Sequence, residues 1–194
     1  MIAIVDYGCG NLQSVKNALD KIGETSLITS SPQEVKSADK IIFPGVGSFG
    51  YAMQQLKKTG LGNAILESIN QNKPFLGICL GLQLLFESSE ESPNVRGLGI
   101  FEGKCLKFKT QKVPQIGWNK ISVQKNSIFK EGYVYFVNSY YVVPQDKSII
   151  ATTTNYSVDF TSAINSKNIT AVQFHLEKSG EFGLEFLKRW SNAD

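Results

Sequence analysis

The sequence predicts an α/β protein whose central sheet is mostly parallel and carries helices on both faces. In the first half of the chain, short apolar segments typical of buried strands alternate with longer segments whose apolar residues recur at helical spacing. Such alternation favours parallel strands joined by right-handed helical crossovers. In the second half, strand-like segments follow one another with short polar connections, which favours antiparallel additions on one side of the sheet. A chain of 194 residues fits one domain, which we place at residues 1–194.

The first half supplies four predicted strands and five predicted helices. The first helix begins near Asn11, a residue type favoured at helix N-caps, and repeats apolar residues on one face as far as Ile22. The second helix begins at Pro32, because proline is favoured at the first helical position. The predicted strands are 2–6, 25–29, 40–43 and 74–78, and the other helices are 49–58, 61–72 and one that begins at Leu80.

The second half supplies six predicted strands and a final helix. The helix opens with Ser179 and places apolar side chains toward the core as far as about Trp190. Residues 88–93, which include Glu90 and Glu91, are expected to form a solvated connection. The predicted strands are 104–109, 120–123, 133–137, 148–155, 160–165 and 170–174.

The composition argues against several classes of protein. The net charge of +3 is small and no cluster of Lys and Arg stands out, so we expect no nucleic-acid partner. No apolar run approaches the length of a membrane span and no basic leader begins the chain, so we expect a cytoplasmic protein without a membrane partner. Cys9, Cys79 and Cys105 form no C-x-x-C pair, so we expect neither disulfides nor a metal site. The Gly8-x-Gly10 turn lacks the third glycine of a dinucleotide site, and no cofactor is expected.

The most informative stretch is 73–87, in which Gly77 and Gly81 flank Cys79 at two residues on either side. This spacing is the cysteine form of a nucleophile elbow, a sharp strand-to-helix turn that exposes the side chain above the end of a sheet. The N-terminus of the next helix would favour a thiolate over a thiol. Gln83, one helical turn further on, could hold a polar substrate beside the sulfur. The alternative is a structural cysteine in an ordinary strand-to-helix connection.

A second group of polar residues follows the predicted strand 170–174. His175 is the only histidine in the chain, and Glu177 lies two residues later, on the same side of an extended segment. The carboxylate could fix the tautomer of the ring and leave its other nitrogen free to act as the base for a nucleophile. In the loop 44–48, two glycines could allow backbone N–H groups to point at a developing oxyanion, and the alternative is a plain turn.

Together these motifs resemble a known family. The segments GICLGLQ around Cys79, PGVG at 44–47 and QFHLEKS at 173–179 resemble class I glutamine amidotransferases, which have a three-layer, flavodoxin-like α/β fold. The opening VDYGCGN and the segment VPQIGWN at 113–119 are similar to the glutaminase subunits of imidazole glycerol phosphate synthases, and the resemblance covers essentially the whole chain. It implies hydrolysis of L-glutamine to glutamate and ammonia, and a heterodimer in which the ammonia passes to a (βα)₈-barrel cyclase subunit for histidine biosynthesis.

The resemblance also implies roles for individual residues. Cys79 would attack the side-chain amide of glutamine, His175 would move the proton, and Glu177 would orient His175. The remaining residues form three groups: oxyanion donors at Gly47 and Leu80; substrate contacts at Gln83, Glu91, Ser139 and Tyr140; and residues facing the barrel subunit at Asn11, Trp118 and Lys178.

Three positions depart from the family pattern. Leu176 stands where the family usually has proline, and Gln115 and Asn138 stand where it usually has histidine. The alternative partner is a synthase of a surface-glycan pathway, in which paralogues of this subunit supply ammonia for amidino or amino sugars. Two other interpretations are a cysteine peptidase, which would need neither Gln83 nor the PGVG loop, and a regulatory module, against which the complete triad argues.

Overall fold

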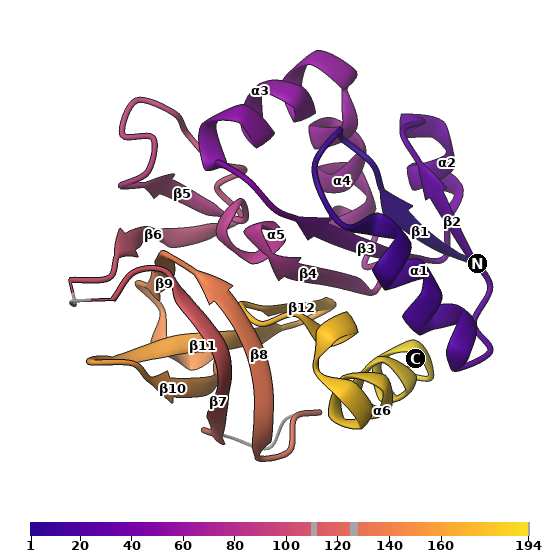
Figure 1. The fold of residues 1–194 in the computed structure, drawn as a ribbon. Helices are drawn as coiled ribbons and strands as arrows, with labels where there is room; N and C mark the ends of the chain where they lie inside the picture. Colours follow the sequence, from indigo (N-terminus) through magenta and orange to yellow (C-terminus); the bar gives the residue numbers. More distant parts are fainter. Residues whose placement is uncertain (110–111, 125–127, 194) are drawn as a thin grey trace.

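The chain folds into three layers with a mixed sheet in the middle (Figure 1). A computed structural model describes residues 1–109, 112–124 and 128–193. The strands of the first half are β1 (Ile2–Val5), β2 (Ser26–Thr29), β3 (Lys40–Gly45), β4 (Phe75–Cys79) and β5 (Phe86–Ser89). Those of the second half are β6 (Phe101–Lys107), β7 (Gln115–Val123), β8 (Gly132–Asn138), β9 (Tyr140–Pro144), β10 (Ile150–Asn155), β11 (Asp159–Ser166) and β12 (Ile169–Val172).

The order of the strands explains how distant segments meet. Among the described residues the main path of the sheet runs β2-β1-β3-β4-β12-β11-β10-β7-β8, while β5, β6 and β9 branch from it through β11. The first four strands are parallel to their neighbours. β12 is also parallel to β4, so the last strand of the chain enters the middle of the sheet. In the order of the sheet, the expected antiparallel additions therefore begin beyond β12, at β11.

Helices cover both faces of the sheet. Two helices, α1 (Leu12–Lys21) and α6 (Gly180–Ser191), pack together on one face, where Leu19, Phe186 and Trp190 belong to one hydrophobic core. The other face carries α2 (Pro32–Ser37), α3 (Phe49–Thr59) and α4 (Leu61–Asn70), whose buried hydrophobic residues belong to a second core. Three short helices complete the structure: α5 (Leu80–Gln83) and the 3₁₀ turns η1 (Lys147–Ile149) and η2 (Leu176–Lys178).

Several expected boundaries were wrong. The helix after Cys79 begins at Leu80, as predicted, but has only four residues, because the chain turns at Leu84 and enters β5. Residues 88 and 89 belong to that strand, so only part of 88–93 is a connection. The two carboxylates in residues 88–93 accept hydrogen bonds within the protein. Glu90 accepts the backbone N–H of Lys107, and Glu91 accepts the backbone N–H of Phe49. Strand β9 was not expected, and β7 begins earlier than the predicted strand 120–123.

Within the described ranges, none of the helices has the length and apolarity needed to cross a membrane. The same residues contain no group of three or more His, Cys, Asp and Glu side chains placed to hold a metal ion.

Candidate active site

Cys79 lies at a strained turn between β4 and α5. Its φ angle is +56°, in the left-handed region that residues other than glycine rarely adopt. Strain of this kind costs about 1–3 kcal/mol and persists only where the surrounding structure enforces it. A Cβ atom on Gly81 would lie 1.9 Å from the carbonyl oxygen of Phe43, and one on Gly77 would lie 3.0 Å from Cβ of Ala171. The two glycines are therefore required because β3, β12 and α5 approach the elbow closely.

The parallel register gathers three chain segments at the carboxyl end of β4. Gly45 at the end of β3 pairs with Cys79, and Val172 at the end of β12 pairs with Ile78. The loop after β3 and the segment after β12 therefore lie on either side of the elbow. This is the edge of a parallel sheet at which ligand sites form.

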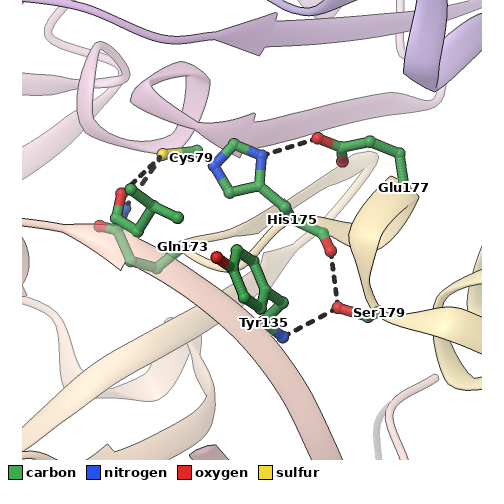
Figure 2. Close-up of polar contacts among 7 residues, drawn as sticks. Cys79, Tyr135, Gln173, His175, Glu177 and Ser179 are labelled. Atoms are coloured by element: carbon green, nitrogen blue, oxygen red, sulfur yellow. Dashed lines mark hydrogen bonds and ion pairs between the residues drawn. The ribbon is translucent and has the colours of Figure 1, made fainter. Parts of the chain in front are cut away.

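His175 and Glu177 lie beside Cys79, as Figure 2 shows. Nδ1 of His175 is 2.7 Å from Oε1 of Glu177, and both side chains are at least 96% buried. The backbone of His175 is tied to β8, because its N–H donates to the carbonyl oxygen of Tyr135 at 2.9 Å. The Ser179 hydroxyl donates to the carbonyl oxygen of His175 at 2.6 Å and accepts the N–H of Tyr135 at 3.1 Å. The ring is thus held on both its side-chain and its backbone sides.

The surroundings of His175 favour its protonated form. Burial lowers the pKa of the ring, but the hydrogen bonds with Cys79 and Glu177 and the negative charges of both groups outweigh burial and raise the pKa to about 10. An imidazolium between a thiolate and a carboxylate is the form that a nucleophilic cysteine needs before reaction.

The other two cysteines are free thiols without such a partner. Cys105 is fully buried, and burial, followed by the charge of Glu91, raises the pKa of its thiol well above the ordinary value. Burial and then the carboxylate of Asp6 raise the pKa of Cys9. Both sulfurs therefore remain protonated and weakly nucleophilic at neutral pH.

A cavity of about 270 Å³ opens over Cys79 and His175. This volume lies just below the roughly 300–1,000 Å³ typical of small-molecule pockets, so the cavity suits a small ligand. It contains all six residues predicted for the oxyanion hole and the substrate, namely Gly47, Leu80, Gln83, Glu91, Ser139 and Tyr140. A larger cavity of about 470 Å³ lies between α3, α4 and residues 95–98, but no cysteine, histidine or carboxylate lines it. The smaller cavity is therefore the one with the reactive groups.

Two residues predicted to bind substrate are already engaged in the protein. Nε2 of Gln83 donates to the carbonyl oxygen of Tyr140 at 3.2 Å and to Oε1 of Gln173 at 3.0 Å. Both of its N–H bonds are used, so only its oxygen remains for a ligand. The carboxylate of Glu91 accepts the backbone N–H of Phe49, at the start of α3, at 2.6 Å.

The predicted oxyanion donors lie on the two sides of Cys79. Gly47 has a φ angle of +96°, which glycine adopts readily, and a Cβ atom there would have open space around it. Leu80 is the first residue of α5, so its N–H has no carbonyl one turn earlier to accept it within the helix.

The residues predicted to face a partner are exposed. Trp118 has 56% of its surface accessible, and Ile116 and Tyr133 on the same β7–β8 hairpin have 56% and 64%. The Trp118 ring lies edge-on to Tyr135, whose ring is 5.9 Å from Nζ of Lys178. Asn11 is exposed in front of α1, a helix that contacts η2.

The three departures from the family pattern have different surroundings. Leu176 is buried in the core shared with α1 and α6. Gln115 and Asn138 pair across β7 and β8, and both are buried. Within the described part of the chain, Oε1 of Gln115 and Oδ1 of Asn138 have no hydrogen-bond partner, while Nδ2 of Asn138 donates to the carbonyl oxygen of Tyr140.

Sequence reasoning missed Tyr135, Gln173 and Ser179 as parts of the site. Gln173 could have been found, because it lies only two residues before His175, directly after the end of β12. Glu177 meets His175 through the 3₁₀ turn Leu176–Lys178, whereas the sequence predicted this contact within an extended segment. Tyr135 reaches the site only through the pairing of β8 with His175, which leaves no local signal in the sequence.

Known proteins resemble this chain along nearly its whole length. The Imidazole glycerol phosphate synthase subunit HisH of Pyrococcus furiosus is 51% identical over 195 residues, which cover 97% of each chain. The Imidazole glycerol phosphate synthase hisHF, chloroplastic, of Arabidopsis thaliana is 45% identical, over 98% of this chain and 34% of the plant protein. A crystal structure of a glutamine amidotransferase shares the fold, with a TM-score of 0.79 at 15% identity and coverage of 98% of this chain and 100% of that one.

The family model matches as well, and it spans almost all the elements described above. Residues 3–191 match the model of Glutamine amidotransferase class-I, from the second residue of β1 to the last residue of α6. The predicted three-layer α/β fold is confirmed. With its fold, its full-length relatives and the family model in agreement, the chain belongs to the class I glutamine amidotransferases.

Proposed function

We propose that this chain is the glutaminase subunit of an imidazole glycerol phosphate synthase, and that it supplies ammonia for histidine biosynthesis. The observation that carries the proposal is the row formed by Cys79, His175 and Glu177 (Figure 2). Cys79 and His175 line one cavity, and the His175 ring is 2.7 Å from the Glu177 carboxylate. A cysteine, a base and a group that orients the base are what acyl transfer through a thioester requires.

In the proposed reaction the thiolate of Cys79 attacks the side-chain carbonyl carbon of L-glutamine. The tetrahedral intermediate carries an oxyanion, which the N–H groups of Gly47 and Leu80 would stabilise. Protonated His175 gives its proton to the leaving nitrogen, the C–N bond breaks, and ammonia leaves a glutamyl thioester. His175 then takes a proton from water, which attacks the thioester and releases glutamate and the thiolate.

The cavity has acceptors that suit the other end of glutamine. Its α-ammonium group has three N–H donors, which the carboxylate of Glu91 and the free Oε1 of Gln83 could accept. Ser139 and Tyr140 line the same cavity beside Gln83. The carboxylate of Glu91 also accepts the backbone N–H of Phe49, so in this proposal it links the substrate to the start of α3.

The exposed β7–β8 hairpin is the proposed docking surface for the (βα)₈-barrel subunit. Ile116, Trp118 and Tyr133 expose apolar area that a partner would bury, and Lys178 adjoins both this surface and the cavity. Asn11 would complete the surface from the side of α1. The much longer plant relative, whose name is that of the synthase, supports a role beside a second functional unit.

We further propose that residues 1–194 act as one domain in the cytoplasm. A single family model matches residues 3–191. The nucleophile must stay a reduced thiol, which suits a reducing compartment, and all three cysteines are free in the structure.

Complementation tests the proposed pathway. The gene for this chain, expressed with the cyclase gene of its own source, should restore growth without histidine in a cell that lacks its own glutaminase subunit. Failure to grow, despite a folded chain whose Cys79 reacts with a glutamine analogue, would exclude the histidine pathway and leave the glycan-pathway synthase. The alternative rests on Gln115 and Asn138, which stand at positions where the family usually has histidine.

A further inference from the structure

A fourth residue contacts the nucleophile from the side opposite His175. Gln173 is completely buried, and its Nε2 lies 3.7 Å from Sγ of Cys79 (Figure 2). The position follows from strand pairing, because Val172 pairs with Ile78 and the next residues of the two strands are Gln173 and Cys79. The backbone N–H of Gln173 continues the sheet by donating to the carbonyl oxygen of Ser162 at 2.8 Å. Its side chain is therefore fixed at both ends.

The direction of the Gln173 amide is determined by a chain of hydrogen bonds. The carbonyl oxygen of Tyr140 can only accept, so Gln83 must present Nε2 to it at 3.2 Å. The same Nε2 donates to Oε1 of Gln173 at 3.0 Å. With its oxygen used in this way, Gln173 must present N–H rather than oxygen to the sulfur of Cys79. A backbone carbonyl thus sets the orientation of two buried amides in succession.

Besides His175, two polar groups contact the sulfur, and they favour opposite protonation states. The carbonyl oxygen of Val137 lies 3.9 Å from Sγ and can only accept, so it favours the thiol. The N–H of Gln173 can only donate, so it favours the thiolate, and a donor is worth more to a charged acceptor than to a neutral one.

We propose that Gln173 is a further residue of the catalytic site, which stabilises the thiolate of Cys79 by an N–H···S hydrogen bond, and that Gln83 is the residue that positions it. This inference rests on the proposed glutaminase mechanism and adds a donor to it. It gives Gln83 a role in the free enzyme, before glutamine enters the cavity.

Other charged or titratable groups also face the sulfur. His175 lies on the segment after β12, Glu91 and Lys178 line the same cavity, and the hydroxyl of Tyr7 comes from the segment after β1. Burial, with the charges of Cys9 and Cys79, raises the pKa of Tyr7 well above its ordinary value, so this group stays neutral near pH 7. The variants used to test the proposal must therefore leave these four groups unchanged.

The test is the rate at which iodoacetamide alkylates Cys79 in the full chain, followed by mass spectrometry of its peptide between pH 5 and 9. In Gln173→Met the donor is lost with little change of shape. We expect the midpoint of the pH profile to rise by about one unit and the rate at pH values below that midpoint to fall about tenfold, as for a weak charge-assisted hydrogen bond. Gln83→Met should cause a smaller change in the same direction, because the Gln173 amide is then free to turn.

The double variant separates this proposal from two independent losses of stability. Because both residues act through one N–H group, Gln83→Met combined with Gln173→Met should react no more slowly than Gln173→Met alone. Thr152→Val removes a comparable buried contact, to Ser162 at 2.8 Å, and should leave the pH profile unchanged. If Gln173→Met does not fold, Gln83→Met decides: a slower reaction supports the proposal and an unchanged profile overturns it.

A folded Gln173→Met variant with the rate and pH profile of the wild type would overturn the inference. It would leave the proposed function intact. That function fails separately if Cys79 of the wild-type chain reacts no faster than Cys9.

Discussion

Cys79 differs from Cys9 and Cys105 in what surrounds its sulfur. It has an imidazole on one side and an amide N–H on the other, whereas burial and nearby carboxylates act on the other two thiols. Reactivity toward electrophiles follows the thiolate fraction rather than exposure alone. The three cysteines should therefore be distinguishable chemically in the native protein.

Cys79→Ala is expected to lower glutamine hydrolysis by a factor on the order of 10⁴–10⁶, because the thioester can no longer form. A glutamine-derived electrophile should label Cys79 in the wild type at pH 7 and spare Cys9 and Cys105. The raised pKa of Cys9 means that its thiolate fraction at any pH is below that of an ordinary thiol, so its labelling should grow only as the pH passes its ordinary value of 9.0. Ammonia release by Cys79→Ala at the wild-type rate would contradict the mechanism.

Glu177→Gln is expected to lower the pKa of His175. The carboxylate hydrogen bond and charge are among the causes that raise this pKa to about 10, so the imidazolium should lose its proton at lower pH in the variant. The chain has a single histidine, so one imidazole resonance in an NMR titration reports the change directly. Activity should fall by roughly 10²–10⁴, less than in Cys79→Ala, because orientation is a smaller term than the nucleophile. An unchanged titration midpoint would show that the carboxylate does not control the ring.

At the scale of secondary structure, the elbow depends on close contact between β3, β4 and α5. The helix that follows Cys79 is too short to be stable alone, so its position comes from packing against the strands. Gly81 permits that packing because its Cα lies against the carbonyl group of Phe43.

Gly81→Ala is expected to destabilise the fold by at least about 1–3 kcal/mol, since the new methyl group must displace backbone atoms. The clash is with the carbonyl oxygen of Phe43, at 1.9 Å from the ideal Cβ. Gly62→Ala in α4 is a matched control, because its Cβ would have only ordinary contacts at 3.7 Å and beyond. The control should be neutral or stabilising by up to about 1 kcal/mol. Urea unfolding measures both, and equal stabilities for the two variants would refute the steric argument.

At the scale of the whole molecule, the cavity over Cys79 and the proposed docking surface share the β7–β8 hairpin. Val137, whose carbonyl contacts Cys79, and Trp118, which is exposed, belong to the two strands of this hairpin. Lys178 contacts the Tyr135 ring and also lines the cavity. A partner that binds the hairpin would therefore contact the same strands that position Val137 beside Cys79.

The isolated chain is expected to hydrolyse glutamine slowly and to be activated by its barrel subunit and the acceptor bound there. If the Val46–Gly47 peptide of the free chain does not donate to the oxyanion, the missing donor costs on the order of 10²–10³ in rate. Docking would favour the donating orientation as a shift of population. Steady-state rates with and without the barrel subunit measure the effect, and fast turnover by the chain alone would exclude this gate.

Trp118→Ala is expected to weaken binding of the barrel subunit by roughly 30-fold, about 2 kcal/mol, as for a buried aromatic hot spot. The Trp118 side chain is exposed in the free chain, so the fold should be unaffected. Tyr51→Ala, an exposed aromatic on α3 at the opposite end of the molecule from the β7–β8 hairpin in Figure 1, is the control and should bind normally. Equal affinities of the two variants would place the docking surface elsewhere.

Much of this protein could be predicted from local patterns in its sequence. The alternation of strands and helices predicts a parallel sheet, because apolar spacing and glycine positions act over a few residues. The G-x-C-x-G spacing predicts a sharp turn at Cys79, and the two-residue spacing of His175 and Glu177 predicts their contact. These features need no knowledge of which strand pairs with which.

The contacts between segments that lie far apart in the sequence were decided only by the tertiary structure. β12 inserts beside β4, and only this brings Gln173 and His175 to Cys79. Whether the N–H groups of Gln83 are free for a substrate depends on Tyr140 and Gln173, which lie far away in the chain. The sequence does not show whether the N–H groups of a side-chain amide are free or are hydrogen-bonded within the protein. The physical reason is that hydrogen-bond partners are chosen by proximity in the folded sheet, and proximity across strands is not a local property of the chain.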